Sequence, residues 1–268
     1  MSNDRPLRGL EAPPSGAAVL RGLFLAPFDE LSDPLALVDL AVGAEAGGWD
    51  GVFLWDHIVY RPPVRAVADP WVALSAIAAH TERLRLGPMV TPLSRRRVQK
   101  VARETVTLDR LSRGRLILGV GLGSSNTREL EPFGEVSDPR ERARLLDEGL
   151  ARLTSLWAGE FEPPPVQQPR IPVWVAARWP NRRPVRRALN WDGLFPIELP
   201  GPEALAELSA EIGRERPRDA GPSDLVVEIE PGEDPGPWRE AGATWVLTGF
   251  GRQPRADEIR AVIAAGPA

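Results

Sequence analysis

The chain has 268 residues and a formal net charge of −4, with 43% hydrophobic and 26% charged residues. This composition is typical of a water-soluble globular protein, and the acidic balance argues against nucleic acid as a partner. Cysteine is absent, which excludes disulfides and sulfur-ligated metals, and only His57 and His80 supply imidazole, so we expect no metal site.

The N-terminal residues 1–18 are rich in proline, glycine and charge, which favours a disordered tail. They contain no apolar core of the kind that a signal peptide needs, and no apolar run elsewhere reaches membrane-spanning length. We therefore expect a cytoplasmic protein without a membrane segment. Residues 19–268 are predicted to form a single domain.

After the tail, short apolar runs alternate with segments of helical periodicity. Asp33, Asp69 and Asp138 each precede a proline, which predicts three helix N-termini. The predicted strands are 19–28, 49–58, 83–90, 116–120, 171–177, 192–197, 225–229 and 244–248. The predicted helices are 34–47, 70–81, 101–111, 139–157, 181–190, 202–214, 237–241 and 256–265.

This alternation within about 250 residues is what a single (β/α)₈ TIM barrel requires, although a doubly wound open sheet has the same alternation. In such a barrel the active site lies at the C-terminal ends of the strands. The strand exits therefore form a short set of candidate site residues. Those singled out are Phe28, Asp56, His57, Met89, Val90, Thr91, Gly121, Leu122, Gly123, Ala177, Arg178 and Trp179.

Asp56 and His57 form the adjacent acid and imidazole among these exits. A histidine at this place can serve as general base, proton donor or hydrogen-bond donor to a bound ring. It can equally pair with the backbone of a surface loop, and its spacing does not separate these alternatives. His80 closes a predicted helix, where a cation suits the helix dipole, so we interpret it as structural.

The glycine-rich exit after residue 120 is not a dinucleotide-binding fingerprint. That motif needs glycine at the position of Ser124 or, in the shifted frame, of Asn126. The sequence also lacks a nucleophile elbow and a P-loop. These glycines therefore indicate close approach of another group without saying which group.

Several segments in one order resemble the bacterial-luciferase-like superfamily of flavin-dependent and F420-dependent oxidoreductases. They include GGWDGVFLWDHI at 47–58, LRLGPMVTPLSRR at 84–96 and ARETVTLDRLSRGRLILGVGLG at 102–123. RIPVWVAARWPNRRPVRRALNWDGLFP at 170–196 and WREAGATWVL at 238–247 continue the similarity. The resemblance covers most of residues 21–247.

The resemblance implies a luciferase-like barrel that binds reduced FMN or coenzyme F420 and oxygenates a small organic substrate or transfers hydride. His57 would contact the flavin ring or act as base, with Asp56 orienting it or sensing the ring. A non-prolyl cis peptide would lie at Pro88-Met89 or next to it. Gly121 to Gly123 and Asn126 would line the polar tail of the cofactor.

Two departures from the family pattern leave other functions open. Ala177, Arg178 and Trp179 stand where many members have a Gly-Gly pair that meets the phosphate, and Arg178 offers a charge in its place. The connection 160–170 is short where others carry a substrate-covering insertion. A flavin-binding barrel without turnover, or a cofactor-free lyase or isomerase using Asp56 and His57, remains an alternative. Members of the family are commonly dimers, so a homodimer is an expectation by resemblance.

Overall fold

The computed structural model describes residues 19–267, so the tail predicted for residues 1–18 lies outside the described residues. The strands are β1 (Leu20–Leu25), β2 (Gly51–Leu54), β3 (Arg85–Pro88), β4 (Thr91–Pro92), β5 (Leu118–Gly121), β6 (Val173–Arg178), β7 (Gly193–Ile197), β8 (Asp224–Ile229) and β9 (Trp245–Gly249). The α-helices are α1 (Pro34–Ala46), α2 (Pro70–His80), α3 (Val98–Leu111), α4 (Pro139–Ser155), α5 (Arg182–Ala188), α6 (Pro202–Glu215), α7 (Gly236–Glu240) and α8 (Ala256–Ala265).

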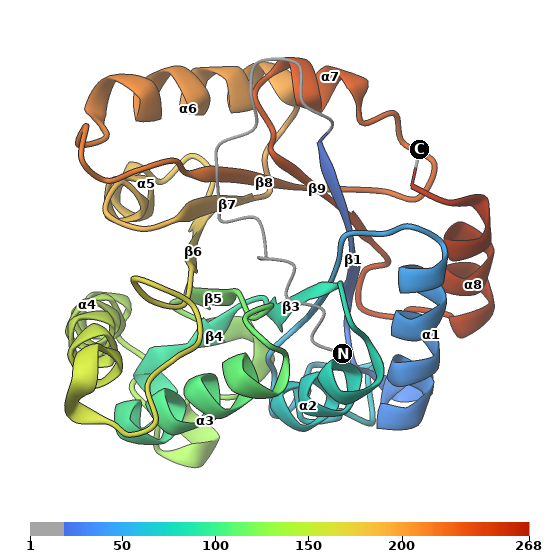
Figure 1. The fold of residues 1–268 in the computed structure, drawn as a ribbon, viewed down its shortest axis with the longest axis horizontal. Helices are drawn as coiled ribbons and strands as arrows, with labels where there is room; N and C mark the ends of the chain where they lie inside the picture. Colours follow the sequence, from blue (N-terminus) through green and yellow to red (C-terminus); the bar gives the residue numbers. More distant parts are fainter. Residues whose placement is uncertain (1–18, 268) are drawn as a thin grey trace, which may run out of the picture.

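The strands form one parallel ring in the order β3-β2-β1-β9-β8-β7-β6-β5-β4, surrounded by the helices (Figure 1). First and last strands pair directly, with Leu20 opposite Trp245 and Phe24 opposite Gly249. A bridge between Leu86 and Leu116 joins the two ends of the strand order. The predicted (β/α)₈ barrel is therefore confirmed, and the open doubly wound sheet is wrong.

The third predicted strand is divided into β3 and β4, which explains nine strands in an eight-membered barrel. The Met89-Val90 peptide between them is cis, next to the position that the family resemblance suggested. β3 approaches β5 so closely that a Cβ on Gly87 would lie 1.8 Å from the Ile117 carbonyl oxygen. Glycine at this position therefore permits the ring to close.

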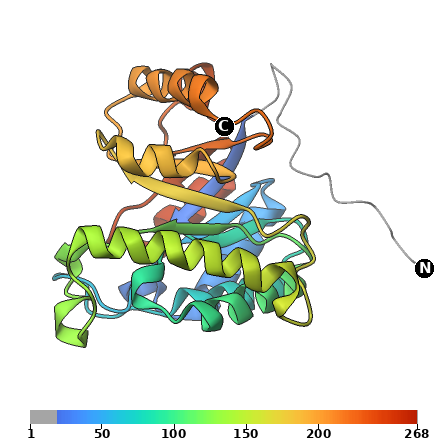
Figure 2. The same cartoon turned by 90° about the vertical axis from the view of Figure 1, so that its left-hand side faces the viewer.

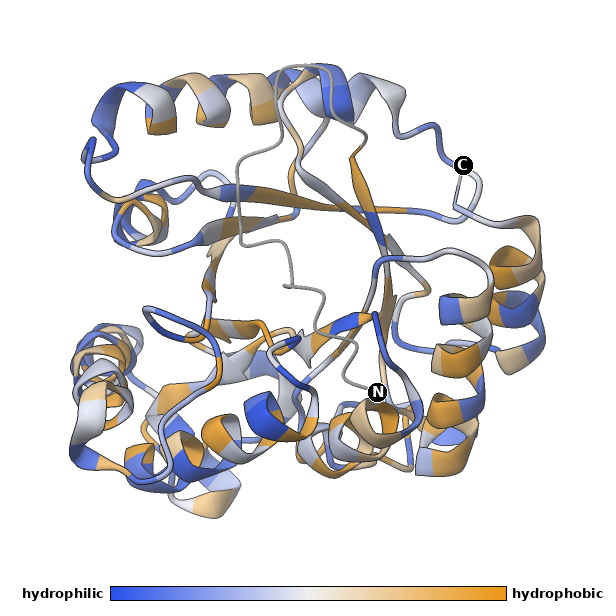
Figure 3. Ribbon diagram, in the orientation of Figure 1, coloured by the Kyte–Doolittle hydropathy of each residue, from blue (hydrophilic) through white to orange (hydrophobic). Residues whose placement is uncertain are grey.

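Apolar side chains pack in two large clusters, one inside the barrel and one between the barrel and its helices, and in a small third cluster of Ala26, Phe28 and Val64. Figure 3 shows hydrophobic residues both along the strands and on the helices. Alternate residues of each strand point to opposite faces, so one strand supplies both cores. On β6, for example, Trp174 lies in the inner cluster and Val173 and Val175 in the outer one. The inner cluster consists of Phe24, Phe53, Met89, Ile117, Trp174, Phe195, Val226, Trp245 and Leu247.

The three predicted Asp-Pro helix starts are confirmed. The carboxylates of Asp33, Asp69 and Asp138 accept hydrogen bonds from the amides of Leu35, Val72 and Glu141 at 2.9, 3.0 and 2.8 Å. The first two strands end earlier than predicted, so residues 26–28 and 55–58 leave the sheet and enter the loops at its C-terminal edge. None of the helices in residues 19–267 is long and apolar enough to cross a membrane.

The short connection after α4 lies at the opposite end of the barrel from the strand exits (Figure 2). Asp109 accepts hydrogen bonds from Val166 and Gln167, and the Gln167 amide donates to the carbonyl of Leu116, just before β5 begins. The connection over residues 160–170 is short, as expected, and it leads directly to the start of β6.

Candidate functional site

The mouth of the barrel, at the C-terminal ends of the strands, has an apolar floor. Trp55, Val90, Ala176 and Ile197 are partly buried and pack on the inner cluster. Met89, predicted as a site residue, belongs to that cluster and is 3% exposed. Both Met89 and Val90 contact the interior, which places the cis peptide at the floor of the mouth.

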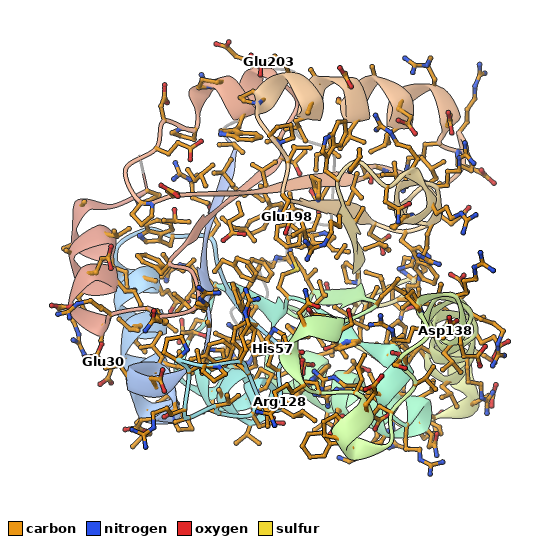
Figure 4. All side chains as sticks on the ribbon, turned by 180° about the vertical axis from the view of Figure 1, so that it is seen from behind. Glu30, His57, Arg128, Asp138, Glu198 and Glu203 are labelled. Carbon is orange, nitrogen blue, oxygen red and sulfur yellow. The ribbon has the colours of Figure 1, made fainter. Side chains whose placement is uncertain are left out.

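His57 stands on one wall of this mouth and is held by Glu129. Its Nδ1 lies 2.7 Å from Oε2 of Glu129, and the two side chains are 16% and 2% exposed. Glu129 follows β5, whereas His57 follows β2, so the dyad depends on the two strands ending at the same edge of the barrel. Figure 4 labels both His57 and Arg128 below the centre of the molecule.

Glu129 is a carboxylate whose remaining lone pairs are also occupied. Oε1 accepts the backbone amide of Ile58 at 2.7 Å, and Oε2 accepts the Thr127 hydroxyl at 2.5 Å. Although burial opposes ionisation, the hydrogen bond and charge of His57, the Thr127 hydroxyl and Arg95 keep the pKa of Glu129 below its ordinary value. An ionised carboxylate only accepts hydrogen bonds, so Nδ1 of His57 carries the proton. In the neutral ring Nε2 is then an acceptor.

Asp56 does not orient His57, contrary to one of its predicted roles. Its carboxylate accepts hydrogen bonds from Thr91 Oγ1 at 2.7 Å and Trp71 Nε1 at 3.1 Å, and it forms ion pairs with Arg95 and Arg96. Desolvation would raise the pKa of Asp56, but the two arginines and Thr91 outweigh it and lower that pKa. The side chain is fully buried, so it does not face the mouth.

Arg95 connects the Asp56 anchor to the His57 wall. Its NH2 lies 3.2 Å from Oδ1 of Asp56 and 3.4 Å from Oε1 of Glu129, and its side chain is 3% exposed. Thr91, predicted to contact a cofactor, donates its hydroxyl hydrogen bond to the carboxylate of Asp56. These contacts join the start of the loop that carries His57 to β4 and to the two arginines that follow it.

Aromatic rings surround the imidazole of His57. Its centroid lies 5.8 Å from Phe28, 5.9 Å from Trp55 and 4.9 Å from Tyr60. Phe28, predicted as a cofactor contact, is itself fully buried beneath this cluster. The rings limit the orientations of the imidazole and exclude water from one of its sides.

The glycine-rich exit of β5 forms a neighbouring wall. A Cβ on Gly121 would lie 2.6 Å from Cγ2 of Val90, so β5 passes close to the cis peptide. The carbonyls of Leu122 and Gly123 accept hydrogen bonds from Arg142 of α4 at 2.9 and 3.1 Å. Asn126 is exposed. Whether these residues line a cofactor tail stays a prediction.

The exit of β6 differs from its predicted arrangement. Ala176 points into the barrel, whereas Ala177 is 2% exposed and packs in the outer core. Arg178 forms an exposed ion pair with Glu198 at the end of β7. Trp179 packs against the outer core, and the guanidinium of Arg182 lies 4.5 Å from its ring centroid.

Two of the cavities lined by residues of the described part of the chain open at this edge of the barrel. The larger, of about 660 Å³, lies at the exits of β7, β8 and β9 and is lined by Ile197, Glu198, Glu228, Glu230, Gly249 and Phe250, among others. The other, of about 550 Å³, lies between the loops after β2 and β5 and is lined by residues that include Ile58, Tyr60, Val64, Arg65, Arg128 and Phe133.

Two acidic residues of the mouth were not predicted as site residues. Glu129 lies 72 residues from His57 in the chain and three residues beyond Asn126, where the predicted exit stopped. Glu228 lies near the end of the predicted strand 225–229, and no neighbouring residue in the sequence marks it as a site residue. Both glutamates can be recognised as site residues only when the barrel is closed and the strand exits come together. Within residues 19–267 no group of three or more histidine or acidic side chains is arranged to hold a metal ion.

Comparison with known proteins gives a consistent result. The model of the luciferase-like monooxygenase family matches residues 22–231. An uncharacterized protein of Mycobacterium tuberculosis is 34% identical over 203 residues, covering 68% of this chain and 69% of that protein. An F420-dependent glucose-6-phosphate dehydrogenase of Beutenbergia cavernae is 32% identical over 236 residues, covering 79% of this chain and 68% of that protein.

Solved structures share the fold at low sequence identity. An F420-dependent secondary alcohol dehydrogenase in complex with an F420-acetone adduct has a TM-score of 0.75 at 16% identity, covering 94% of this chain and 98% of that one. The oxygenating constituent of 3,6-diketocamphane monooxygenase from Pseudomonas putida, in complex with FMN, has a TM-score of 0.67 at 18% identity, covering 81% of this chain and 69% of that one.

Proposed function

This chain belongs to the luciferase-like monooxygenase family, and from that membership we propose that it is an oxidoreductase that binds coenzyme F420 or reduced FMN at its barrel mouth. The observation that carries the proposal is the His57–Glu129 dyad, which holds a partly exposed imidazole on the wall of that mouth. The substrate is a small organic molecule.

The residues of the mouth fit a flat ring with apolar faces and polar edges. Val90, Ala176 and Ile197 supply apolar surface, and the Trp55 indole nitrogen is buried without a hydrogen-bond partner. A buried donor without a partner is costly unless a ligand satisfies it. When bound, the redox group supplies hydride transfer or, as a reduced flavin, oxygen activation.

His57 has the tautomer that a general base needs. Glu129 holds the proton on Nδ1, so Nε2 accepts the hydroxyl proton of an alcohol as hydride leaves the adjacent carbon. The carboxylate then stabilises the imidazolium that forms, as in other carboxylate–histidine pairs. Arg95 and Thr127 keep the carboxylate in place during this step.

We favour hydride transfer with coenzyme F420. Relatives with a stated activity include the F420-dependent glucose-6-phosphate dehydrogenase of Beutenbergia cavernae, which is 32% identical. Monooxygenation with reduced FMN is the second candidate, and the description of the matching family model supports it. Both candidates use the same mouth and the same dyad.

A titration separates the candidates. Purified protein is mixed with F420, FMN or, without oxygen, reduced FMN, and absorbance and fluorescence are followed. We expect F420 to bind, while binding of reduced FMN alone would favour monooxygenation. If none of the three binds, the redox function is wrong and the cofactor-free barrel becomes the better hypothesis.

A matched pair of histidine variants tests the role of the dyad. His57→Ala should retain the fold and lower turnover about 10²- to 10⁴-fold, the usual contribution of a general base. His80→Ala is the control, because His80 is exposed at the end of α2 and its Nδ1 lies 2.8 Å from the carbonyl oxygen of Ala76, in its own helix. Equal turnover of the two variants would remove His57 from the mechanism.

We also propose a cytoplasmic homodimer that uses the outer faces of α1 and α2. These helices contact each other and expose Leu35 and Val72, which are 67% and 64% exposed, and α1 also exposes Val42 at 42%. An interface on these two helices would remove these exposed apolar side chains from water. Light scattering should give a dimer for the wild type and a monomer for Leu35→Glu/Val72→Glu, and a monomeric wild type would contradict the proposal.

A further inference from the structure

Glu228 is an unpaired carboxyl group inside the barrel mouth. It lies on β8 two residues after Val226, which belongs to the inner cluster, so its side chain is on the same inward face. It lines the 660 Å³ cavity together with Ile197 and Phe250. Among the contacts of residues 19–267 its carboxylate has no hydrogen bond and no ion pair.

The neighbouring strand leaves space for this carboxyl group. Gly249 of β9 faces it, and a Cβ on Gly249 would lie 2.2 Å from Oε1 of Glu228. Any larger residue at 249 would displace the carboxyl group. The glycine therefore allows Glu228 to stand at the strand exits, where this fold has its chemistry.

The charges around Glu228 do not neutralise it. The ionisable side chains that line the same cavity are Glu198, Glu230, Glu233 and Glu258, and none of them is a cation. Glu198 is paired with Arg178, and Glu233 accepts a hydrogen bond from the Trp238 indole at 2.7 Å. Glu228 thus differs from Glu129 and Asp56, whose carboxylates are held by arginines.

We propose that Glu228 is a second proton-transfer group of the site, which gives a proton to the redox cofactor while His57 takes the hydroxyl proton of the substrate. The assignment rests on the proposed F420 or flavin chemistry. It adds a residue on the opposite wall of the mouth, from a strand that contributes nothing to the His57 network.

The proton balance requires a second group of this kind. When an alcohol becomes a ketone, its C–H bond supplies hydride to the oxidised cofactor, and its O–H proton goes to Nε2 of His57. The reduced ring gains a negative charge, which a proton from the Glu228 carboxyl cancels. Proton exchange with water then returns His57 to the neutral form and Glu228 to the acid, so atoms and charges balance.

The environment of Glu228 suits an exchangeable proton. Water reaches the carboxyl group from the open cavity, yet the protein walls remove enough solvation to raise the pKa of Glu228 to about 7. A group with a pKa near neutrality is present in both forms and gives and takes a proton readily. As an acid it donates a hydrogen bond to the ring, and as a carboxylate it repels an anionic ring.

The test measures cofactor binding and therefore needs no known substrate. F420 is titrated into the wild type, Glu228→Gln and Glu230→Gln between pH 5.5 and 8.5, with fluorescence as the readout. As the pH rises and Glu228 loses its proton, the affinity of the wild type for F420 should fall about tenfold relative to the affinity of Glu228→Gln. A tenfold change corresponds to one pKa unit of differential binding. Glu230→Gln, altered in the same cavity, should follow the wild type.

A second measurement reports the proton without any cofactor. In ¹³C-glutamate NMR of the cofactor-free protein, one carboxyl resonance should titrate near pH 7 and be absent from Glu228→Gln. Parallel pH dependence of F420 binding in the wild type and Glu228→Gln, or no carboxyl titration near neutrality, would overturn this role alone. Failure of both F420 and FMN to bind the wild type would overturn the proposed function and this role with it.

Discussion

The two walls of the barrel mouth hold their acidic groups in opposite ways. On the β2 and β5 side, Asp56 and Glu129 are nearly inaccessible and every lone pair direction meets an arginine, hydroxyl, indole, imidazole or amide donor. On the β8 side, Glu228 is open to the cavity and has no partner among the described residues. The pKa is lowered for the first two groups and raised for the third.

This difference in hydrogen bonding suggests different roles, with Asp56 and Glu129 positioning other residues and Glu228 exchanging a proton. A carboxylate surrounded by donors stays ionised across the physiological range and fixes the residues attached to it. A carboxyl group that is partly desolvated and has no donors has a raised pKa, so its charge changes closer to neutrality. The first wall therefore provides geometry for His57, and the second provides a proton whose presence depends on pH.

The largest effect should follow removal of the Asp56 charge. Asp56→Asn leaves the guanidinium groups of Arg95 and Arg96 buried beside a neutral amide, and breaking such a pair costs about 3–5 kcal/mol. The free energy of unfolding in urea measures the loss. Asp147→Asn, which breaks an exposed ion pair with Arg187, should cost less than about 1 kcal/mol.

The Asp56 effect should also depend on pH in a defined direction. Because the pKa of Asp56 is lowered in the folded protein, its ionised form contributes stability above the unfolded value of 3.8. That contribution is lost as the pH falls through the folded pKa. The difference between wild type and Asp56→Asn should therefore shrink in acid, and a difference that is constant down to pH 2 would contradict the ion-pair explanation.

The second-largest effect should follow removal of the Glu129 charge, and it should appear in the turnover rate. Glu129→Gln keeps the side-chain shape but no longer fixes the proton on Nδ1 of His57 or stabilises the imidazolium. A fall of about 10²- to 10⁴-fold in kcat is expected, as for other carboxylate–histidine pairs. If kcat of Glu129→Gln equals that of the wild type while His57→Ala is inactive, Glu129 only supports the loop.

The fold was predictable because its signals repeat along the chain, whereas the dyad was not. Asp33, Asp69 and Asp138 each start a helix in a local pattern with the following proline, and the apolar runs mark each barrel position. His57 and Glu129 meet only because the exits of β2 and β5 lie at one edge. No short sequence pattern predicts that His57 and Glu129 are in contact.

The predicted partner of His57 failed for a related reason. Asp56 is adjacent to His57 in sequence, but neighbouring residues of an extended segment point to opposite sides, so Asp56 turns toward Arg95 and Arg96 and His57 toward the mouth. The same alternation puts Ala176, and not Ala177, on the interior. Because the two residues are adjacent in an extended segment, their side chains point apart and cannot form the predicted contact.

A smaller effect should follow from filling the space beside Glu228. Gly249→Ala places a Cβ where Oε1 now lies, and the flexible side chain must turn away. The carboxyl group is kept, but its place in the mouth is lost, so the pH dependence of F420 binding should weaken by a few-fold relative to the wild type. Gly213→Ala on α6 is the control, because no atom lies within 4 Å of its Cβ position and its helical backbone accepts a side chain. An equal response of both variants would mean that the position of Glu228 does not matter.

The smallest effect concerns stability and tests the β8 wall without any ligand. The pKa of Glu228 is about 7 in the folded protein against 4.5 when unfolded, so between these values the unfolded state releases a proton that the folded state retains. Stability is therefore lost as the pH rises through this window, and the loss persists above it. Glu228→Gln lacks the penalty, and water in the cavity screens part of it, so its Tm should exceed that of the wild type by about 2–4 °C at pH 8 and by less at pH 5. Glu230→Gln should show no such change with pH. If the Tm of Glu228→Gln exceeds that of the wild type by the same amount at both pH values, the pKa of Glu228 is not raised in the folded protein. The two walls would then not differ in how they hold their acidic groups.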